Sequence, residues 1–374
     1  MCKIFRVRAC VWHKIEHKKD LRTVQDAKKK YSCHQGDSKL QKTGKQNGLT
    51  DVQGLQVGHY SEFDALSGVT VVLCPQGAVA GVDVRGAAPG TRETDLLNPV
   101  NLVDKVQAVV LSGGSVYGLA TADGVVRWLS QKGCGFPLEN GHVAPIVPSA
   151  VLYDLGRGRD FIPPITAEWG RQACQSANTD KPSNGCVGAG VGALSGAIKG
   201  GQGSASIVLE TGLTVAALAA VNSLGSVVNP ATGRLWECDL ELDDEFGAQA
   251  RRCVKQPRPS PGAPAQNTTI GVIACDAMLN KAQACKIAQM AHDGLGRAIR
   301  PAHTMFDGDT LFCLATGVHP LPAMQGFMDV SQAQAINEIG QAAANCLSRA
   351  IIHAILAAHS FGQMPAFRDL EERC

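Results

Sequence analysis

Short apolar runs that end at glycine or proline fill most of the chain from Gly48 onward. Runs of β-branched and aliphatic residues with such boundaries are typical of strands, and runs that are apolar throughout are typical of strands buried on both faces. The pattern therefore predicts strands at residues 69–73, 79–84, 143–155, 204–209, 214–228 and 269–274.

Four segments have the spacing of helices. Residues 119–131 and 166–177 are the first two, and the last helix is predicted to begin with the capping-box spacing Ser331-x-x-Gln334 and to run towards Ala358. The third helix has apolar residues every four positions on one face: Ile287, Ala291, Leu295 and Ile299. Helices and central strands in this proportion predict an α/β fold in which helices cover the sheets.

The composition is typical of a large globular protein. With 374 residues, 45% of them hydrophobic, the chain can bury a substantial core. The apolar run at residues 213–221 is too short for a membrane span, and we expect a cytoplasmic protein without a secretory signal or a membrane partner. The 14 cysteines lack a CxxC pair and the ten histidines lack any ligand spacing, so we expect mostly buried thiols, no metal and no other cofactor.

Charge is distributed unevenly along the chain. Residues 1–48 carry 13 Lys and Arg against 4 Asp and Glu, whereas the remainder carries 22 against 29. We expect residues 1–47 to form a basic, disordered head and residues 48–374 to form a single folded domain. After the head there is no stripe of basic residues interleaved with aromatic ones, which argues against nucleic acid as a partner.

Two glycine-rich segments suggest other functions. Residues 185–196 are dense in glycine but contain neither GxGxxG nor GxxxxGK[ST], which disfavours a phosphate-binding loop. Ser115 lies in a sequence similar to a nucleophile elbow, but Tyr117 occupies the position of the last glycine in GxSxG. A tight turn between a strand and a helix is the better interpretation of this segment.

The junction Asn267-Thr268-Thr269 is the strongest candidate for chemistry. It lies between a proline-rich segment, residues 255–266, and an apolar run that reads as a buried strand. A threonine hydroxyl is a weak nucleophile without a base, and cutting the bond before Thr268 would free an α-amine to act as that base. Such an amine has a pKa of about 7.7–8.0 in an unperturbed chain, which suits base catalysis near neutral pH. On these residues alone, an ordinary junction of loop and strand stays an alternative.

Six segments carry a family resemblance: residues 54–59 (GLQVGH), 111–119 (LSGGSVYGL), 148–154 (PSAVLYD), 228–230 (VNP), 267–270 (NTTI) and 306–312 (FDGDTLF). In sequence and order they resemble the DmpA-type aminopeptidase/D-esterase family, which includes β-aminopeptidases and nylon-oligomer hydrolases. The resemblance implies a four-layer αββα sandwich and a precursor that cuts itself into an α-chain ending at Asn267 and a β-chain of residues 268–374. It also implies a homo-oligomer, a tetramer of αβ units.

The resemblance assigns roles position by position. Thr268 corresponds to the nucleophile, which is serine in many aminopeptidases of the family and threonine in its nylon-oligomer hydrolases. Asn229 corresponds to an asparagine whose amide N–H stabilises the oxyanion, and Lys199 to a lysine whose charge keeps the new amine neutral and basic. Asp307 and Asp309 correspond to an acidic pair that orients the nucleophile and receives a substrate ammonium.

Further site residues follow from the same resemblance. Tyr153 corresponds to a residue that lines the pocket and donates to the oxyanion, and Gly113, Gly114 and Ser115 belong to a segment expected to bind substrate. Taken alone, these positions have ordinary structural interpretations: turns for the asparagine and the Asp-Gly-Asp sequence, a surface position for the lysine and a core position for the tyrosine.

The sequence therefore predicts an N-terminal-threonine hydrolase of small amides, peptides or esters with a free amino end. Two alternatives stay open. The ornithine acetyltransferase group shares the fold and a threonine self-cut, although the sequence around its nucleophile differs from this one. An uncut, non-catalytic homologue that serves in binding or assembly is the other alternative, and the presence of every expected site residue counts against it.

Overall fold

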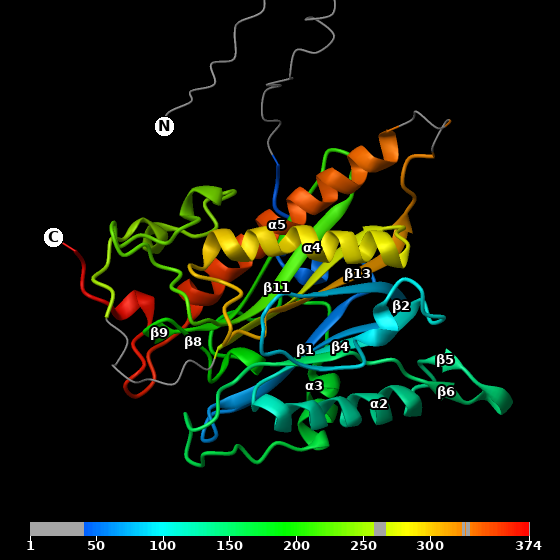
Figure 1. The fold of residues 1–374 in the computed structure, drawn as a ribbon, viewed down its shortest axis with the longest axis horizontal. Helices are drawn as coiled ribbons and strands as arrows, with labels where there is room; N and C mark the ends of the chain where they lie inside the picture. Colours follow the sequence, from blue (N-terminus) through cyan, green and yellow to red (C-terminus); the bar gives the residue numbers. More distant parts are fainter. Residues whose placement is uncertain (1–40, 258–266, 324–325, 327–329, 374) are drawn as a thin grey trace, which may run out of the picture. The chain divides into compact units, whose positions relative to one another are not determined.

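In the computed structural model, helices cover both sides of a mixed sheet that bends back on itself (Figure 1). The structure describes residues 41–257, 267–323, 326 and 330–373. Among these residues, nine strands are joined in the hydrogen-bonded order β10-β11-β12-β13-β2-β4-β7-β3, and β1 also pairs with β2. The bend lies within β2 and divides the strands into two sheets.

The first sheet contains the strand that begins at Thr268. It consists of β10 (Gly201–Val208), β11 (Thr214–Asn222), β12 (Thr268–Ala277), β13 (Thr310–His319) and the second part of β2 (Ser67–Val84). β12 pairs antiparallel with β11 and parallel with β13. Every residue of β12 is buried, which accounts for the continuous apolar run in its sequence.

The second sheet consists of β1 (Gln56–Glu62), the first part of β2, β4 (Lys105–Ser112), β7 (Ser149–Val151) and β3 (Gly90–Arg92). The register of β2 against β4 shifts between Leu73 and Ala78. Residues before the shift pair with β1 and residues after it pair with β13. One long strand therefore passes from one sheet to the other.

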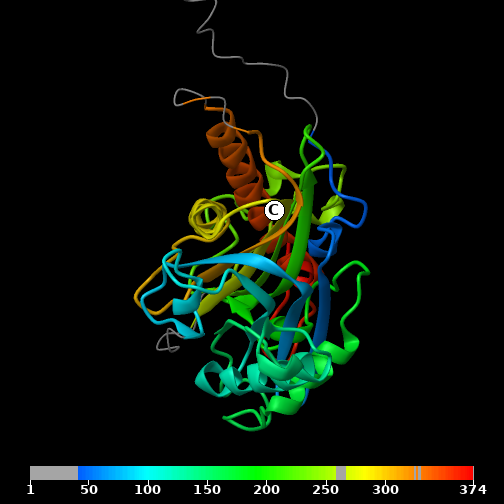
Figure 2. The same cartoon turned by 90° about the vertical axis from the view of Figure 1, so that its right-hand side faces the viewer.

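Helices form the two outer layers (Figures 1 and 2). α4 (Lys281–Ala298) and α5 (Ser331–Ala357) pack on the first sheet, and α2 (Thr121–Gln131) and α3 (Ala167–Ser176) pack on the second. Three clusters of buried side chains fill the spaces between the layers: helices against the first sheet, sheet against sheet, and the second sheet against its helices. The four-layer αββα fold predicted from the sequence is confirmed.

Short elements connect the layers. β5 (Phe136–Pro137) pairs with β6 (Val143–Ala144), and β8 (Leu194–Ser195) pairs with β9 (Ile198–Lys199). Short 3-10 helices occur at Leu49–Asp51, Asp95–Leu97, Ser115–Ala120, Glu139–Gly141, Gly188–Gly190, Cys238–Leu240, Ala248–Arg251 and Phe367–Asp369.

Three element boundaries differ from the sequence prediction. The region 143–155 contains only the short strands β6 and β7. The strand expected over 214–228 ends at Asn222, because the residues after it leave the sheet and bond to the β8–β9 hairpin through Ser223 and Ser195. The last helix has Val330 at its N-cap and no side-chain capping bond, so the capping box predicted from residues 331 and 334 does not form.

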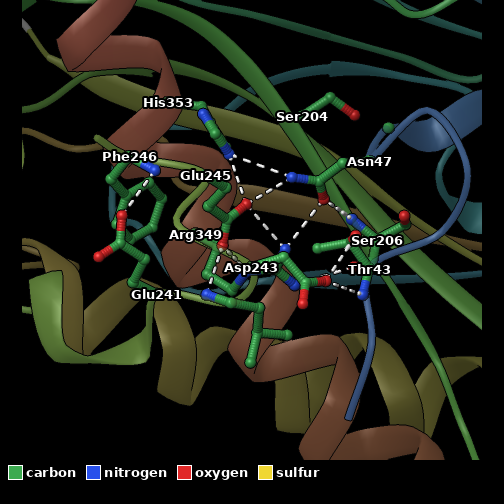
Figure 3. Close-up of polar contacts among 12 residues, drawn as sticks. Thr43, Asn47, Ser204, Ser206, Glu241, Asp243, Glu245, Phe246, Arg349 and His353 are labelled. Atoms are coloured by element: carbon green, nitrogen blue, oxygen red, sulfur yellow. Dashed lines mark hydrogen bonds and ion pairs between the residues drawn. The ribbon is translucent and has the colours of Figure 1, made fainter.

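A buried polar network ties the start of the described chain to α5 (Figure 3). The Arg349 guanidinium donates to the Glu245 carboxylate and to the side-chain oxygen of Asn47. The ring of His353 lies 2.7 Å from the same carboxylate. Burial opposes ionisation of Glu245, but hydrogen bonds from His353 and Arg349 outweigh it and lower the pKa of Glu245 to about 2. The network therefore holds a buried negative charge between the Arg349 guanidinium and the His353 ring.

Residues 41–47 belong to this folded body, although their composition led us to include them in the head. Thr43 donates from its backbone N and its hydroxyl to the Asp243 carboxylate, at 3.2 and 3.0 Å. The compact unit begins at Gln41. Residues 1–40 lie outside the described residues, so a disordered head stays a prediction.

The described cysteines are all free thiols, and six of the ten are buried. Burial raises the pKa of Cys74 and Cys275 to about 12, so these thiols stay protonated and pack as small apolar groups. In the described ranges, no helix combines the length and the apolar character needed to cross a bilayer.

Candidate active site

Thr268 lies at the N-terminal end of a central strand of the first sheet, and its side chain faces the second sheet. It is the first residue of β12, and its register partner on β11 is Asn222. Side chains alternate along a strand, and the alternate residues Ile270 and Val272 belong to the cluster between the two sheets. Thr268 and Asn222 therefore point into the same space, where the two sheets open at their rim.

The Thr268 hydroxyl is held against the bond that the sequence marks for cutting. Oγ1 donates to the carbonyl oxygen of Asn267 and accepts from the backbone N of Gly308 at 3.2 Å. A Cβ at Gly308 would lie 2.7 Å from the carbonyl oxygen of Ala88 and 3.0 Å from the Thr268 hydroxyl. Glycine is therefore required in the Asp-Gly-Asp sequence for the backbone to approach the hydroxyl.

The two acidic residues support the backbone around Thr268. Asp309 accepts from the backbone N of Thr269 at 2.7 Å, and its other oxygen accepts from the backbone N of His303 and contacts the His303 ring at 2.8 Å. Asp307 accepts from the backbone N and hydroxyl of Thr304 at 2.8 and 2.7 Å. The other carboxylate oxygen of Asp307 is buried and has no hydrogen-bond partner among the described residues.

A cavity of about 400 Å³ opens beside the threonine. Its lining includes Thr268, Asn267, Ser115 and Tyr153. The remaining lining residues carry no charged side chain: Ala88, Pro89, Gly90, Val116, Val151, Leu152, Met305 and Phe306. The cavity can accept a small, largely apolar group next to the hydroxyl.

The turn at residues 113–115 is built for close backbone packing. A Cβ at Gly113 would lie 2.1 Å from a carboxylate oxygen of Asp154, and Gly114 has φ +80° in the left-handed region. Asp154 is fully buried and accepts from the backbone N of Gly114 and the hydroxyl of Ser67 at 2.6 and 2.8 Å. Burial raises the pKa of Asp154 to about 6. The glycines thus shape the turn, and Ser115 is the member that reaches the cavity.

Lys199 is buried below the rim and is not a surface lysine. Its ammonium donates to the carbonyl oxygens of Gly190, Ala193 and Gly200 at 2.9–3.0 Å. Burial lowers the pKa of Lys199 to about 8. Lys199 is the last residue of β9 and stands shortly before β10, whose first residue, Gly201, pairs with Val221 next to Asn222. Lys199 does not line the cavity.

Asn229 is not brought to the cavity. Its side-chain oxygen accepts from the backbone N of Ala231 at 2.9 Å, and its carbonyl oxygen accepts from the backbone N of Gly233 at 2.7 Å, as in a tight turn. The asparagine beside Thr268 is Asn222, which sequence reasoning missed. The sequence pattern around Asn222 predicted a strand that continues to residue 228. Asn222 would have stood out only if the end of the strand at this residue had been recognised.

No cluster of three or more His, Cys, Asp or Glu side chains suited to a metal ion occurs within the residues that the structure describes. Thr268 and Tyr153 bring a hydroxyl and a phenol to the lining of the cavity, and the amide of Asn222 and the buried carboxylates of Asp307 and Asp309 lie around Thr268 without lining it. This set can perform acyl transfer by nucleophilic attack with hydrogen-bond stabilisation of an oxyanion.

Comparison with known proteins identifies the family. The model of peptidase family S58 matches residues 47–365, most of the described chain. The chain belongs to peptidase family S58. The family resemblance predicted from the six sequence segments is confirmed, and membership makes the chain a hydrolase of the aminopeptidase and amidase kind.

Relatives of the S58 protein agree with this assignment. An uncharacterized aminopeptidase of Mycobacterium bovis is 48% identical over 346 residues, covering 87% of this chain and 98% of the relative. A 6-aminohexanoate-oligomer endohydrolase of Kocuria sp. is 30% identical over 301 residues, covering 77% and 80%. The solved L-aminopeptidase D-Ala-esterase/amidase of Ochrobactrum anthropi, a variant of the Ntn hydrolase fold, superposes with a TM-score of 0.66 at 24% identity, covering 88% and 90%.

Proposed function

We propose that this S58 protein cuts itself before Thr268 and then uses Thr268 as an N-terminal nucleophile to hydrolyse small amides, peptides or esters with a free amino end. The observation that carries the proposal is the contact between the Thr268 hydroxyl and the carbonyl oxygen of Asn267, at the wall of a cavity. The hydroxyl already lies against the group that it would attack.

Self-cleavage would proceed by an acyl shift. The hydroxyl oxygen of Thr268 attacks the carbonyl carbon of Asn267, the C–N bond breaks, and the hydroxyl proton passes to the departing nitrogen. Water then opens the resulting ester, which leaves a carboxylate on Asn267 and a free hydroxyl and amine on Thr268. The contact from the Gly308 backbone N helps to hold the hydroxyl for the first step.

Substrate hydrolysis would reuse the same hydroxyl. The new α-amine of Thr268 removes the proton during attack, and donors near the cavity stabilise the negative oxygen that forms. Asn222, opposite Thr268, and the Tyr153 phenol are the donors that the geometry favours, in place of Asn229. The buried cation of Lys199, close to Asn222 along the sheet, favours the neutral form of the amine.

Asp307 and Asp309 have different roles in this proposal. Asp309 is fully engaged in orienting Thr269 and His303, so it acts as a support. Asp307 has an unused oxygen and is the bridge partner of Asn267. Departure of the Asn267 end after the cut would uncover that oxygen, which could then receive the ammonium of a substrate.

The names of the relatives favour hydrolysis over acetyl transfer. One is an aminopeptidase and another acts on 6-aminohexanoate oligomers, whose bonds are amides. For this chain, an amide with a free amino end is the substrate class that fits both the relatives and the uncovered carboxylate. A homo-oligomer of αβ units stays part of the proposal by family resemblance, and a cytoplasmic location stays part of it from the composition of the chain.

The central test is the fate of the bond before Thr268. Purified protein should run as two fragments on a denaturing gel, and sequencing of the smaller one should begin at Thr268. The Thr268→Ala variant should remain one folded, inactive chain, because losing one hydroxyl at a strand start does not unfold a core of this size. A wild-type chain that stays intact after long incubation but still hydrolyses alanine p-nitroanilide would contradict self-cleavage.

A further inference from the structure

The side-chain amide of Asn222 has three fixed hydrogen bonds. Its oxygen accepts from the Arg157 guanidinium and from the backbone N of Leu194 at 3.0 Å. Its nitrogen donates to the carbonyl oxygen of Tyr153 at 3.0 Å. Two donors on the oxygen and one acceptor on the nitrogen leave a single orientation for the amide, so the NH₂ group must lie on the side of Tyr153.

One N–H of Asn222 remains beyond these three bonds. An amide NH₂ group has two hydrogens, and the bond to the Tyr153 carbonyl uses one of them. Asn222 is the register partner of Thr268, and paired residues in antiparallel strands have Cα atoms about 4.5–5.5 Å apart. The second N–H takes part in none of these three bonds, and the strand pairing places the amide next to Thr268.

Arg157 places a positive charge on the amide oxygen. Its guanidinium also donates to the carbonyl oxygen of Gly192 at 2.7 Å, which fixes its position. Burial lowers the pKa of Arg157 to about 10, so the guanidinium stays charged at neutral pH. A cation on an amide oxygen draws electron density from the nitrogen and makes the N–H a stronger donor.

We propose that Arg157 is a positioning residue that orients and polarises the Asn222 amide, so that its free N–H donates to the oxyanion formed when Thr268 attacks. The inference rests on the proposed function and adds a residue to it. Asp154 and Arg157 come from one short segment after Tyr153: Asp154 holds the 113–115 turn and Arg157 holds Asn222. This segment thereby holds both the turn that carries Ser115 and the amide that pairs with Thr268.

The experiment compares Arg157→Met and Arg157→Lys with a matched control, Arg159→Met, in which the replaced arginine is exposed in the same loop. Self-cleavage is followed on gels, and hydrolysis of alanine p-nitroanilide is followed by absorbance. Arg157→Met should lower kcat by roughly tenfold with KM changed by less than about twofold, because an oxyanion donor acts in the transition state. Arg157→Lys should recover part of the loss, and Arg159→Met should match the wild type.

A double-mutant cycle with Asn222→Ala makes the test specific. If Arg157 acts through Asn222, the Arg157→Met change should have almost no further effect on kcat once Asn222 is alanine. An equal loss in both backgrounds, or wild-type kcat in folded Arg157→Met, would overturn the inference. If Arg157→Met does not fold, as judged by circular dichroism, Arg157→Lys takes its place in the cycle.

Failure of the proposed function would look different. Hydrolysis by the Thr268→Ala variant would contradict the nucleophile itself, whatever Arg157 does. An inert Thr268→Ala variant together with additive effects of Arg157 and Asn222 would leave the nucleophile in place and remove only the positioning role.

Discussion

Asn222 and Thr268 are register partners on neighbouring strands, and both side chains face the space between the two sheets. In the uncut chain, the Thr268 hydroxyl already donates a hydrogen bond to the carbonyl oxygen of Asn267. The same pair of strands therefore positions the proposed nucleophile and the proposed amide donor without help from a flexible loop. Such placement on rigid elements favours a reproducible attack geometry.

We expect separately encoded chains to bypass self-cleavage. Co-expression of residues 1–267 with a chain that begins at Thr268 should give an active enzyme, because the free amine is present from the start. The same pair with alanine at position 268 should assemble and stay inert. Hydrolysis of alanine p-nitroanilide by the alanine pair would place the nucleophile elsewhere, with Ser115 and Thr269 as the next candidates.

Alanine substitutions of Asn222 and Asn229 should have clearly different effects on kcat. Asn222→Ala should lower kcat by about 10²–10³, as expected for loss of an oxyanion donor. Asn229→Ala should leave kcat within about twofold and lower the free energy of unfolding by about 1 kcal/mol, because its side chain only supports a turn. Steady-state kinetics and urea unfolding of both variants check this. The reverse ranking of kcat would restore the role first assigned to Asn229.

Substrates with a blocked amine should react slowly. Alanine p-nitroanilide should be hydrolysed at least about tenfold faster than its N-acetylated form, since the acetylated nitrogen loses its charge-assisted hydrogen bond to Asp307. Asp307→Asn should narrow this ratio, whereas Asp104→Asn, at an exposed position, should not. If Asp307→Asn slows self-cleavage, the two rates are measured on co-expressed chains of residues 1–267 and 268–374, which need no cut. Equal rates on both substrates would remove the ammonium-binding role.

Acid should weaken the fold through Glu245. Its pKa falls from 4.5 to about 2 on folding, so the folded state binds fewer protons between these values. The contribution of Glu245 to the free energy of unfolding is fully present above about pH 4.5 and is lost as the pH falls towards 2, by on the order of 3 kcal/mol. Glu245→Gln should flatten this part of the pH profile in urea titrations. Glu371→Gln, at an exposed ion pair, should keep the wild-type slope.

Truncation should reveal where the folded body starts. Removal of residues 1–40 should leave the free energy of unfolding unchanged, whereas removal of residues 1–47 should lower it by about 2 kcal/mol or more. The longer deletion takes away Asn47, a partner of the buried Arg349 guanidinium. Equal stability of the two truncated proteins would show that the boundary predicted from composition was adequate.

Local sequence was enough to single out Thr268 as the candidate nucleophile and Asp307 and Asp309 as its acidic neighbours. Thr268 follows a proline-rich segment and starts an apolar run, and the Asp-Gly-Asp sequence stands directly before a strand, so each signal lies within a few residues. The αββα layers followed from the family resemblance. The number of layers could not be read from the strand pattern, because β2 belongs to both sheets and its pairing with β13 joins residues far apart in the chain.

The register of β11 against β12 could not be predicted from local sequence. Asn222 and Thr268 are 46 positions apart, and only the pairing of β11 with β12 brings them together. The apolar residues that follow Asn222 continue the strand pattern although the chain leaves the sheet there. Arg157 is equally hidden, since its importance depends on an amide that lies in another layer.

The position of β12 has a consequence for the lifetime of the enzyme. β12 is hydrogen-bonded to β11 on one side and to β13 on the other. After a cut before Thr268, β12 would be the first strand of the new chain and would stay hydrogen-bonded between these two strands. The two pieces would stay together while folded, but after complete unfolding they would have to find each other in solution. Heat or denaturant would then inactivate the cut enzyme irreversibly at low concentration, whereas the uncut precursor could refold as a single chain.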